Sequence, residues 1–107
     1  MGSTLDFTAY ICDQLEGIGA IRHRKMFGEY MIYVNEKPVV LVCDDTVFLK
    51  MLPCLEQLLA GRPTGNPYEG AKEHYILDPD DRETLRRASA LAEEVTPLPQ
   101  KRKSRKN

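Results

Sequence analysis

This chain of 107 residues contains three cysteines and two histidines, which are the first candidates for catalysis or metal binding. Cys12, Cys43 and Cys54 are widely spaced and form no C-x-x-C pair, so they fit neither a disulfide framework nor a zinc site. His23 and His74 have no histidine or cysteine ligand close to them in the sequence. We therefore expect reduced thiols, no bound metal and no cofactor.

Cys54 and the adjacent pair Asp44 and Asp45 are the remaining candidates for catalysis. Cys54 follows Pro53 at the expected start of a short helix, where the helix dipole would stabilise a thiolate. No histidine is near it in the sequence, which favours a packing role. The two aspartates suit a hairpin turn better than acid–base or metal chemistry. Because the sequence also lacks a phosphate-binding loop and a G-x-S-x-G motif, we predict that the protein is not an enzyme.

The segment RHRK, residues 22–25, is the first of two basic segments. Side chains alternate along a strand, so Arg22 and Arg24 should lie on one face and His23 and Lys25 on the other. We predict that Arg22, Arg24 and Lys25 bind a protein partner. Two alternatives stay open, namely a nucleic-acid patch and a solvated strand end that discourages edge pairing.

The second basic segment is the tail. Residues 1–100 contain 10 Lys and Arg against 16 Asp and Glu, a net charge of −6, whereas residues 101–107 contain five basic residues and no acidic one. The tail is therefore predicted to bind nucleic acid weakly and without sequence preference. The residues expected to do so are Lys101, Arg102, Lys103, Arg105 and Lys106.

Apolar periodicity places the elements that must position these residues. The pattern predicts a helix over 5–16, four strands, a short helix over 53–61, an irregular loop, a fifth strand and a last helix that is capped by Asp78 and has Pro79 at its first position. Its buried stripe should end at Val95. The strands are expected at 22–27, 30–34, 38–43, 47–51 and 74–77, with the irregular loop at 62–71. Hairpin connections then indicate an α+β fold, a two-layer sandwich with an antiparallel meander sheet.

The strands are apolar at both parities, which is unusual for a sheet that is covered on one side. Tyr30, Ile32 and Val34 should face one way while Met31 and Tyr33 face the other. Either helices cover both faces or a second subunit covers one of them. We predict a homodimer.

Composition places the chain among globular proteins, with 42% apolar and 29% charged residues. We expect one domain over residues 1–96 and a disordered basic tail over 97–107. No apolar stretch is long enough to span a membrane, and the first residues lack the order of a signal peptide. A cytoplasmic location without membrane contact is the resulting expectation.

The segments RKMFGEY, residues 24–30, and VNEKPVVLVCDDTVFLK, residues 34–50, resemble the amino-terminal domain of the TfoX/Sxy family, bacterial regulators of competence for DNA uptake. LDFTAYICDQLEGIG, residues 5–19, is similar to the first helix of that family, and YEGAKEHYILDPDDRETL, residues 68–85, to the end of its single-domain members. The resemblance implies a small, often dimeric α+β domain, similar to secretion-chaperone-like folds, that regulates transcription through a partner. Met26, Phe27 and Gly28 are expected to set a strand and a turn.

The leading functional hypothesis is a non-enzymatic protein-interaction module with a regulatory role in transcription or competence, whose partner belongs to the transcription machinery. One alternative is a small nucleic-acid-binding protein that uses the basic tail. Another is a ligand-binding domain or enzyme with a reactive Cys54.

Overall fold

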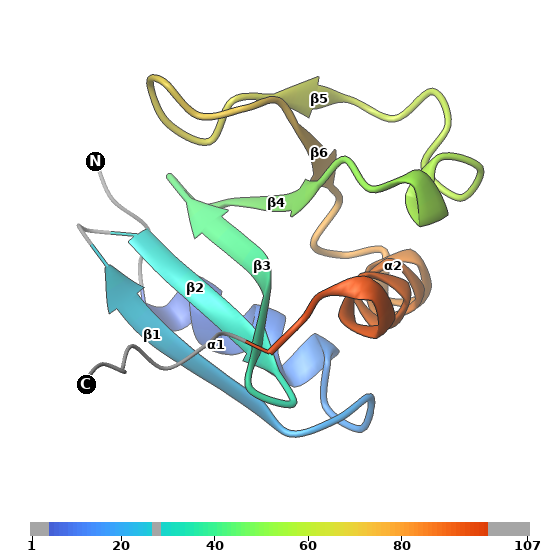
Figure 1. The fold of residues 1–107 in the computed structure, drawn as a ribbon. Helices are drawn as coiled ribbons and strands as arrows, with labels where there is room; N and C mark the ends of the chain where they lie inside the picture. The colour runs from blue at the N-terminus through green and yellow to red at the C-terminus, as the bar shows by residue number, and fades with distance from the viewer. Residues whose placement is uncertain (1–4, 27–28, 99–107) are drawn as a thin grey trace, which may run out of the picture.

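The computed structural model describes residues 5–26 and 29–98, and within them the chain forms two α-helices and a six-stranded sheet (Figure 1). All strand pairs are antiparallel, in the order β1-β2-β3-β4-β6-β5. The expected α+β two-layer fold is confirmed. The elements are α1 (Leu5–Gln14), β1 (Ile21–Met26), β2 (Glu29–Val34), β3 (Lys37–Cys43), β4 (Thr46–Lys50), a 3₁₀ helix (Pro53–Leu55), β5 (Thr64–Gly65), β6 (His74–Leu77) and α2 (Arg82–Val95).

Two tight turns connect the central strands. Asn35 and Glu36 join β2 to β3 with φ of 54° and 68°, and Asp44 and Asp45 join β3 to β4 with φ of 54° and 53°. A two-residue hairpin of type I′ needs positive φ at both positions, and Asn and Asp tolerate that region better than most residues. The turn role expected for the aspartate pair is confirmed. The first loop is one residue shorter than expected, because Lys37 already belongs to β3.

The hydrophobic core lies between the sheet and the two α-helices. Ile32, Val40, Leu49 and Tyr75 are directly opposite one another across four neighbouring strands, and together they form one row of the inner face. The first three are fully buried and Tyr75 is nearly so. The helix side chains of the same core are Ile11 and Leu15 near α1, and Leu85, Ala88 and Ala92 on α2.

The start of α2 differs from the expectation. Asp81 is the N-cap, since its carboxylate accepts a hydrogen bond from the Thr84 amide at 3.2 Å. Asp78 instead accepts from the Asp80 amide at 2.9 Å in the turn before the helix. The predicted cap was wrong because several aspartates precede the helix and each can cap it. Val95 was also misplaced in the buried stripe, because it is 54% exposed.

The helix expected over residues 53–61 is also wrong. Pro53–Leu55 form a single 3₁₀ turn, and hydrogen-bonded turns continue to Gly61, whose φ is 77°. Helix nucleation is costly, and this segment is too short to gain many propagating bonds before Gly61. Leu55 and Leu59 are nevertheless fully buried in the core. The loop that follows, expected to be irregular, contributes the two-residue strand β5.

The β2–β3 hairpin is fastened to the end of α2 by an ion pair. Lys37 Nζ lies 3.0 Å from Glu93 Oε2 and also donates to the Glu93 carbonyl at 3.0 Å. Asn35 Nδ2 donates to the same carboxylate at 3.4 Å. These donors favour the ionised form, so Lys37 first and Asn35 second lower the pKa of Glu93 from its ordinary value.

Glu93→Gln should make the free energy of unfolding less dependent on pH in the acidic range. A carboxylate whose pKa is lowered by folding stabilises the fold above its unfolded pKa, and this contribution is lost as the pH falls through the folded pKa. The variant should therefore unfold at lower urea than the wild type at pH near 7, and the gap should close at pH near 3. Urea titrations at both pH values test this. Glu94→Gln, at the neighbouring exposed position, is the control for removal of one charge. Equal urea midpoints for the wild type and Glu93→Gln at neutral pH would contradict the prediction.

Candidate functional site

The outer face of the sheet carries a second apolar row. Met31 is opposite Leu41, Leu41 is opposite Phe48, and Phe48 is opposite Ile76. Because these residues alternate with the core row, they point away from α1 and α2, which both pack on the inner face (Figure 1). Of the two arrangements left open by the sequence, helices on both faces are therefore excluded for the described residues.

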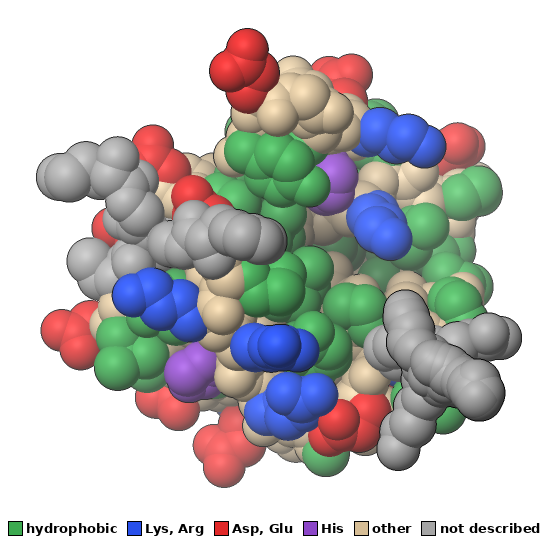
Figure 2. Space-filling view, turned by 60° about the vertical axis from the view of Figure 1, so that its left-hand side comes forward, with side chains coloured by type: hydrophobic (Ala, Val, Ile, Leu, Met, Phe, Trp, Pro, Cys, Tyr) green, Lys and Arg blue, Asp and Glu red, His purple; other side chains and the backbone are tan. Residues whose placement is uncertain are grey.

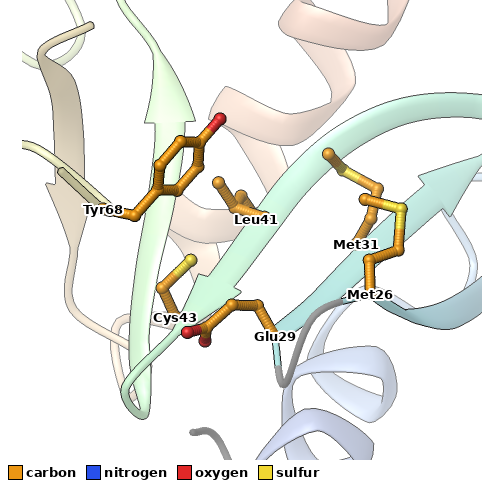
Figure 3. Close-up of a pocket in the computed structure, with 6 residues that line it drawn as sticks. All are labelled: Met26, Glu29, Met31, Leu41, Cys43 and Tyr68. Atoms are coloured by element: carbon orange, nitrogen blue, oxygen red, sulfur yellow. The ribbon is translucent and has the colours of Figure 1, made fainter. Parts of the chain in front are cut away.

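A hollow of about 460 Å³ opens over this outer row (Figure 3). Its walls come from β1, β2 and β3 and from Tyr68, which belongs to the connection between β5 and β6. The Tyr68 side chain stands across the hollow from the two methionines, with Leu41 between them (Figure 3). Its lining residues are Met26, Glu29, Met31, Leu41, Cys43 and Tyr68.

The hollow continues toward β4 and β6. A second hollow of about 580 Å³ shares Met31, Leu41 and Tyr68 with the first. It adds charged groups of both signs from its rim, namely Lys50, Lys72 and Glu73, together with His74. Figure 2 shows the result as hydrophobic side chains in the middle of one face with lysines and arginines beside them. This outer apolar face suits contact with another macromolecule better than the capture of a fully enclosed small molecule.

Cys43 lies at the end of the hollow but is not a reactive thiol. The residue is 1% exposed, and burial, together with the nearby Glu29 carboxylate, raises the pKa of its thiol to about 12. Glu29 also accepts a hydrogen bond from the Asp44 amide at 3.2 Å. Since the thiolate is the nucleophile, a thiol that stays protonated at neutral pH is inert.

Cys54 does not have the environment expected from the sequence. It sits in the single 3₁₀ turn, so no helix dipole acts on its thiol. Its Sγ lies 3.8 Å from the Leu91 carbonyl oxygen, as a weak donor toward α2. The third cysteine, Cys12, is half-buried, and burial raises the pKa of its thiol. None of the three is joined in a disulfide.

The basic residues of β1 divide between the two faces as predicted. Arg22 and Arg24 are opposite Tyr33 and Met31 on the outer face, whereas Lys25 is opposite Tyr30 on the inner face. Arg22 is held in place, because its guanidinium pairs with Glu36 at 2.9–3.1 Å and lies 4.2 Å from the centre of the Tyr33 ring.

Arg24 and Lys25 are exposed and make no ion pair with the residues that the structure describes. The five basic tail residues predicted to bind nucleic acid, and also Phe27 and Gly28, lie outside the described residues.

Both histidines make aromatic contacts. His23 meets the Tyr30 ring edge-on at 5.6 Å, and His74 meets Phe48 at 6.4 Å. His74 Nδ1 also lies 2.7 Å from the Lys72 carbonyl oxygen. Over residues 5–26 and 29–98, no group of three His, Cys, Asp or Glu side chains is placed to hold a metal ion. In the same ranges, no helix has the length and apolar character needed to cross a membrane.

Comparison with known proteins assigns the family. The family model described as the TfoX N-terminal domain matches residues 13–95. The chain belongs to this family. A protein of Spirochaeta aurantia, described as an uncharacterized 12.7 kDa protein in the trpE 5' region, is 33% identical over 78 residues, which are 73% of this chain and 68% of that relative.

The match to the TfoX N-terminal domain confirms the resemblance seen in the sequence and contains the whole candidate site. All six residues that line the first hollow lie within positions 13–95, as do Arg22, Arg24 and Lys25. The match begins inside α1 and ends with the last residue of α2. The site is thus part of the family domain.

Sequence reasoning missed the hollow itself. The apolar residues at both parities of β2 correctly indicated a face without a helix, but nothing local showed that Tyr68 would stand over it. Tyr68 is 37 positions from Met31 in the sequence, and it belongs to a segment that looked only irregular. An exposed aromatic residue among glycines and prolines was the available signal.

Proposed function

We propose that this protein is a non-enzymatic protein-interaction module of the cytoplasm that acts in transcriptional regulation through a protein partner. The observation that carries the proposal is the outer face of the sheet, where Met31, Leu41 and Tyr68 surround a hollow not covered by either α-helix. Contiguous apolar surface of this kind marks an interaction site. Methionine is well suited to such a surface, because its flexible thioether can fit partners of different shape.

The thiols support this proposal over catalysis. Cys43 has a pKa raised to about 12, and Cys12 is half-buried with a raised pKa, so neither offers a thiolate at neutral pH. Cys54 is exposed, and the hydrogen-bond partner of its Sγ is the Leu91 carbonyl oxygen at 3.8 Å, which is not a general base. Membership of the TfoX N-terminal domain family is the second support, since the resemblance implies regulation through a partner.

We further propose that a second copy of the chain covers the outer face, which makes the protein a homodimer. In a two-fold interface the same surface meets itself, so it must be complementary to itself. The outer face meets this requirement, because its apolar floor is bordered by Lys50 and Lys72 and by Glu29 and Glu73. The protein partner then meets the free edge of the sheet along β1, where Arg22 and Arg24 lie at the border of the outer face and Lys25 lies on the inner face.

The dimer makes the proposal testable. Light scattering at micromolar concentration should give the mass of two chains for the wild type and of one chain for Met31→Lys, because the lysine would place a charge in the apolar floor. Val95→Lys is the matched control, since Val95 is exposed on α2 and should leave the dimer intact. A wild-type mass of one chain would remove the homodimer from the proposal.

The same variant tests the function in cells. Transcript profiles of a deletion strain should change, and wild-type protein should restore them whereas Met31→Lys should not. Changes in DNA-uptake genes would support competence as the regulated process, and changes elsewhere would indicate another regulated set. An unchanged transcriptome with an altered metabolite pool would sink the regulatory role.

A further inference from the structure

β1 is an edge strand of the sheet. It pairs with β2 along residues Ile21–Met26, and no strand of the described chain pairs with its other side. Residues 22–25 are all exposed. An edge strand presents a row of backbone N–H and C=O groups that another strand can bind.

The ladder shows which groups those are. The Asn35 amide donates to the Ala20 carbonyl at 2.8 Å, so Ala20 and Asn35 form a hydrogen-bonded pair. This pair lies next to the pair of Ile21 and Val34. Bonded and non-bonded pairs alternate along antiparallel strands. The backbone groups of Arg22 and Arg24 therefore face β2, and those of Ile21, His23 and Lys25 face outward. These residues are two positions apart, which is the spacing at which one strand makes hydrogen bonds to the same neighbouring strand.

The charges of β1 determine what kind of strand fits there. An added strand would place its side chains next to Arg22 and Arg24 on one face and next to His23 and Lys25 on the other. Arg22 is already paired with Glu36, but Arg24 and Lys25 make no ion pair among the described residues. Carboxylates on both faces of the incoming strand would pair with them.

We propose that β1 binds an extended, acidic segment of a protein partner as an additional strand of the sheet. The outward backbone groups of His23 and Lys25 supply main-chain hydrogen bonds, and Arg24 and Lys25 select glutamate or aspartate. This inference rests on the proposed function and names the partner chemistry for its basic site.

Other occupants fit less well. Antiparallel pairing of two β1 strands would place Arg22, Arg24 and Lys25 beside the same charges of a second copy, and directly opposed like charges are destabilising. The chain's own tail is basic as well, so it is repelled. A nucleic acid would use the charges but cannot continue a ladder of alternating donors and acceptors. The basic side chains of β1 are also divided between the two faces of the sheet, so they do not form one continuous patch for a nucleic acid.

The test uses the full chain and a labelled short peptide of glutamate, valine and threonine, with binding measured by fluorescence anisotropy. A lysine-for-glutamate peptide tests charge, and a glutamate peptide that is N-methylated at alternate amides tests the main-chain ladder. The glutamate peptide should bind, and both counterparts should bind at least about tenfold more weakly. Equal binding of the N-methylated peptide would overturn strand addition.

Variants of the protein locate the site. Arg24→Glu with Lys25→Glu should weaken binding of the glutamate peptide at least about tenfold, and the control Arg82→Glu, in the first turn of α2, should not. His23→Pro should weaken binding too, because it removes an outward N–H that β2 does not use, while the thermal melt shows the fold retained. Unchanged binding by the double variant would overturn the assignment, as would full competition by a DNA oligonucleotide.

The outcome is separable from that of the proposed function. If strand addition is wrong but the protein is still a regulatory module, His23→Pro, which removes an outward N–H and keeps Arg24 and Lys25, will restore the transcript profile of the deletion strain and the peptide will not bind. If the proposed function is wrong, the wild-type protein will have no transcripts to restore, whatever the peptide does.

Discussion

Leu49→Ala is expected to lower the free energy of unfolding by about 2–5 kcal/mol. Leu49 is fully buried on β4, between Val40 on β3 and Tyr75 on β6. Truncation removes apolar contacts and leaves a cavity that the neighbouring strands cannot close, because each is fixed by its own ladder. For a domain of this size, such a loss is a large fraction of the total stability.

Equilibrium urea unfolding, followed by circular dichroism, measures the effect. Met51→Ala is the control, because Met51 follows β4 directly and is 46% exposed, so its truncation should change the free energy of unfolding by less than about 0.5 kcal/mol. Equal midpoints for Leu49→Ala and the wild type would mean that the register of β4 is wrong by one residue, since such a shift turns Leu49 to the outer face.

Local signals in the sequence were sufficient for most of the sheet. Asp44 and Asp45 identified a tight turn because turn chemistry depends on the two residues themselves. The alternation of Tyr30, Ile32 and Val34 with Met31 and Tyr33 fixed the two faces, and the structure confirms that the first three are buried while the others are half-exposed. Strand ends were displaced by only one residue.

Where two local structures are nearly equal in stability, the sequence alone does not show which one forms. Asp78 and Asp81 both have the side chain of a good cap, and in the structure Asp81 takes that position while Leu85, four residues later, is buried in the core. The segment after Pro53 has helical spacing in Leu55 and Leu59, but these leucines are buried by a chain of turns. Tertiary contacts overrode a weak local preference in both places.

The candidate site was only half visible in the sequence. Arg24 and Lys25 could be assigned to opposite faces from strand alternation alone, and the structure confirms this. That β1 is an edge strand follows from the order of the whole sheet, which no local pattern gives. The position of Tyr68 over Met31 depends on the path of the connection between β5 and β6, so it required the structure.

Removal of residues 101–107 should abolish binding of DNA while the fold persists. The tail carries five basic residues, whereas residues 1–100 carry a net charge of −6 that repels a polyanion. The two charges of β1 that make no ion pair with the described residues, on Arg24 and Lys25, lie on opposite faces of the strand, so they cannot act together on one phosphate backbone. The tail is therefore the segment of the chain best suited to attract nucleic acid.

Salt dependence gives this prediction a quantitative limit. Each neutralised phosphate contributes about −0.9 to the slope of log affinity against log salt, so five basic residues allow a slope no steeper than about −4.5. A protein with the same tail residues in shuffled order is the matched control, and it should bind as well as the wild type because the interaction does not depend on sequence. Anisotropy titrations of a labelled duplex at several salt concentrations measure both quantities. Tight binding by the protein without its tail would contradict the prediction, and it would transfer the nucleic-acid site to Arg22, Arg24 and Lys25, where an acidic peptide would then have to compete with DNA.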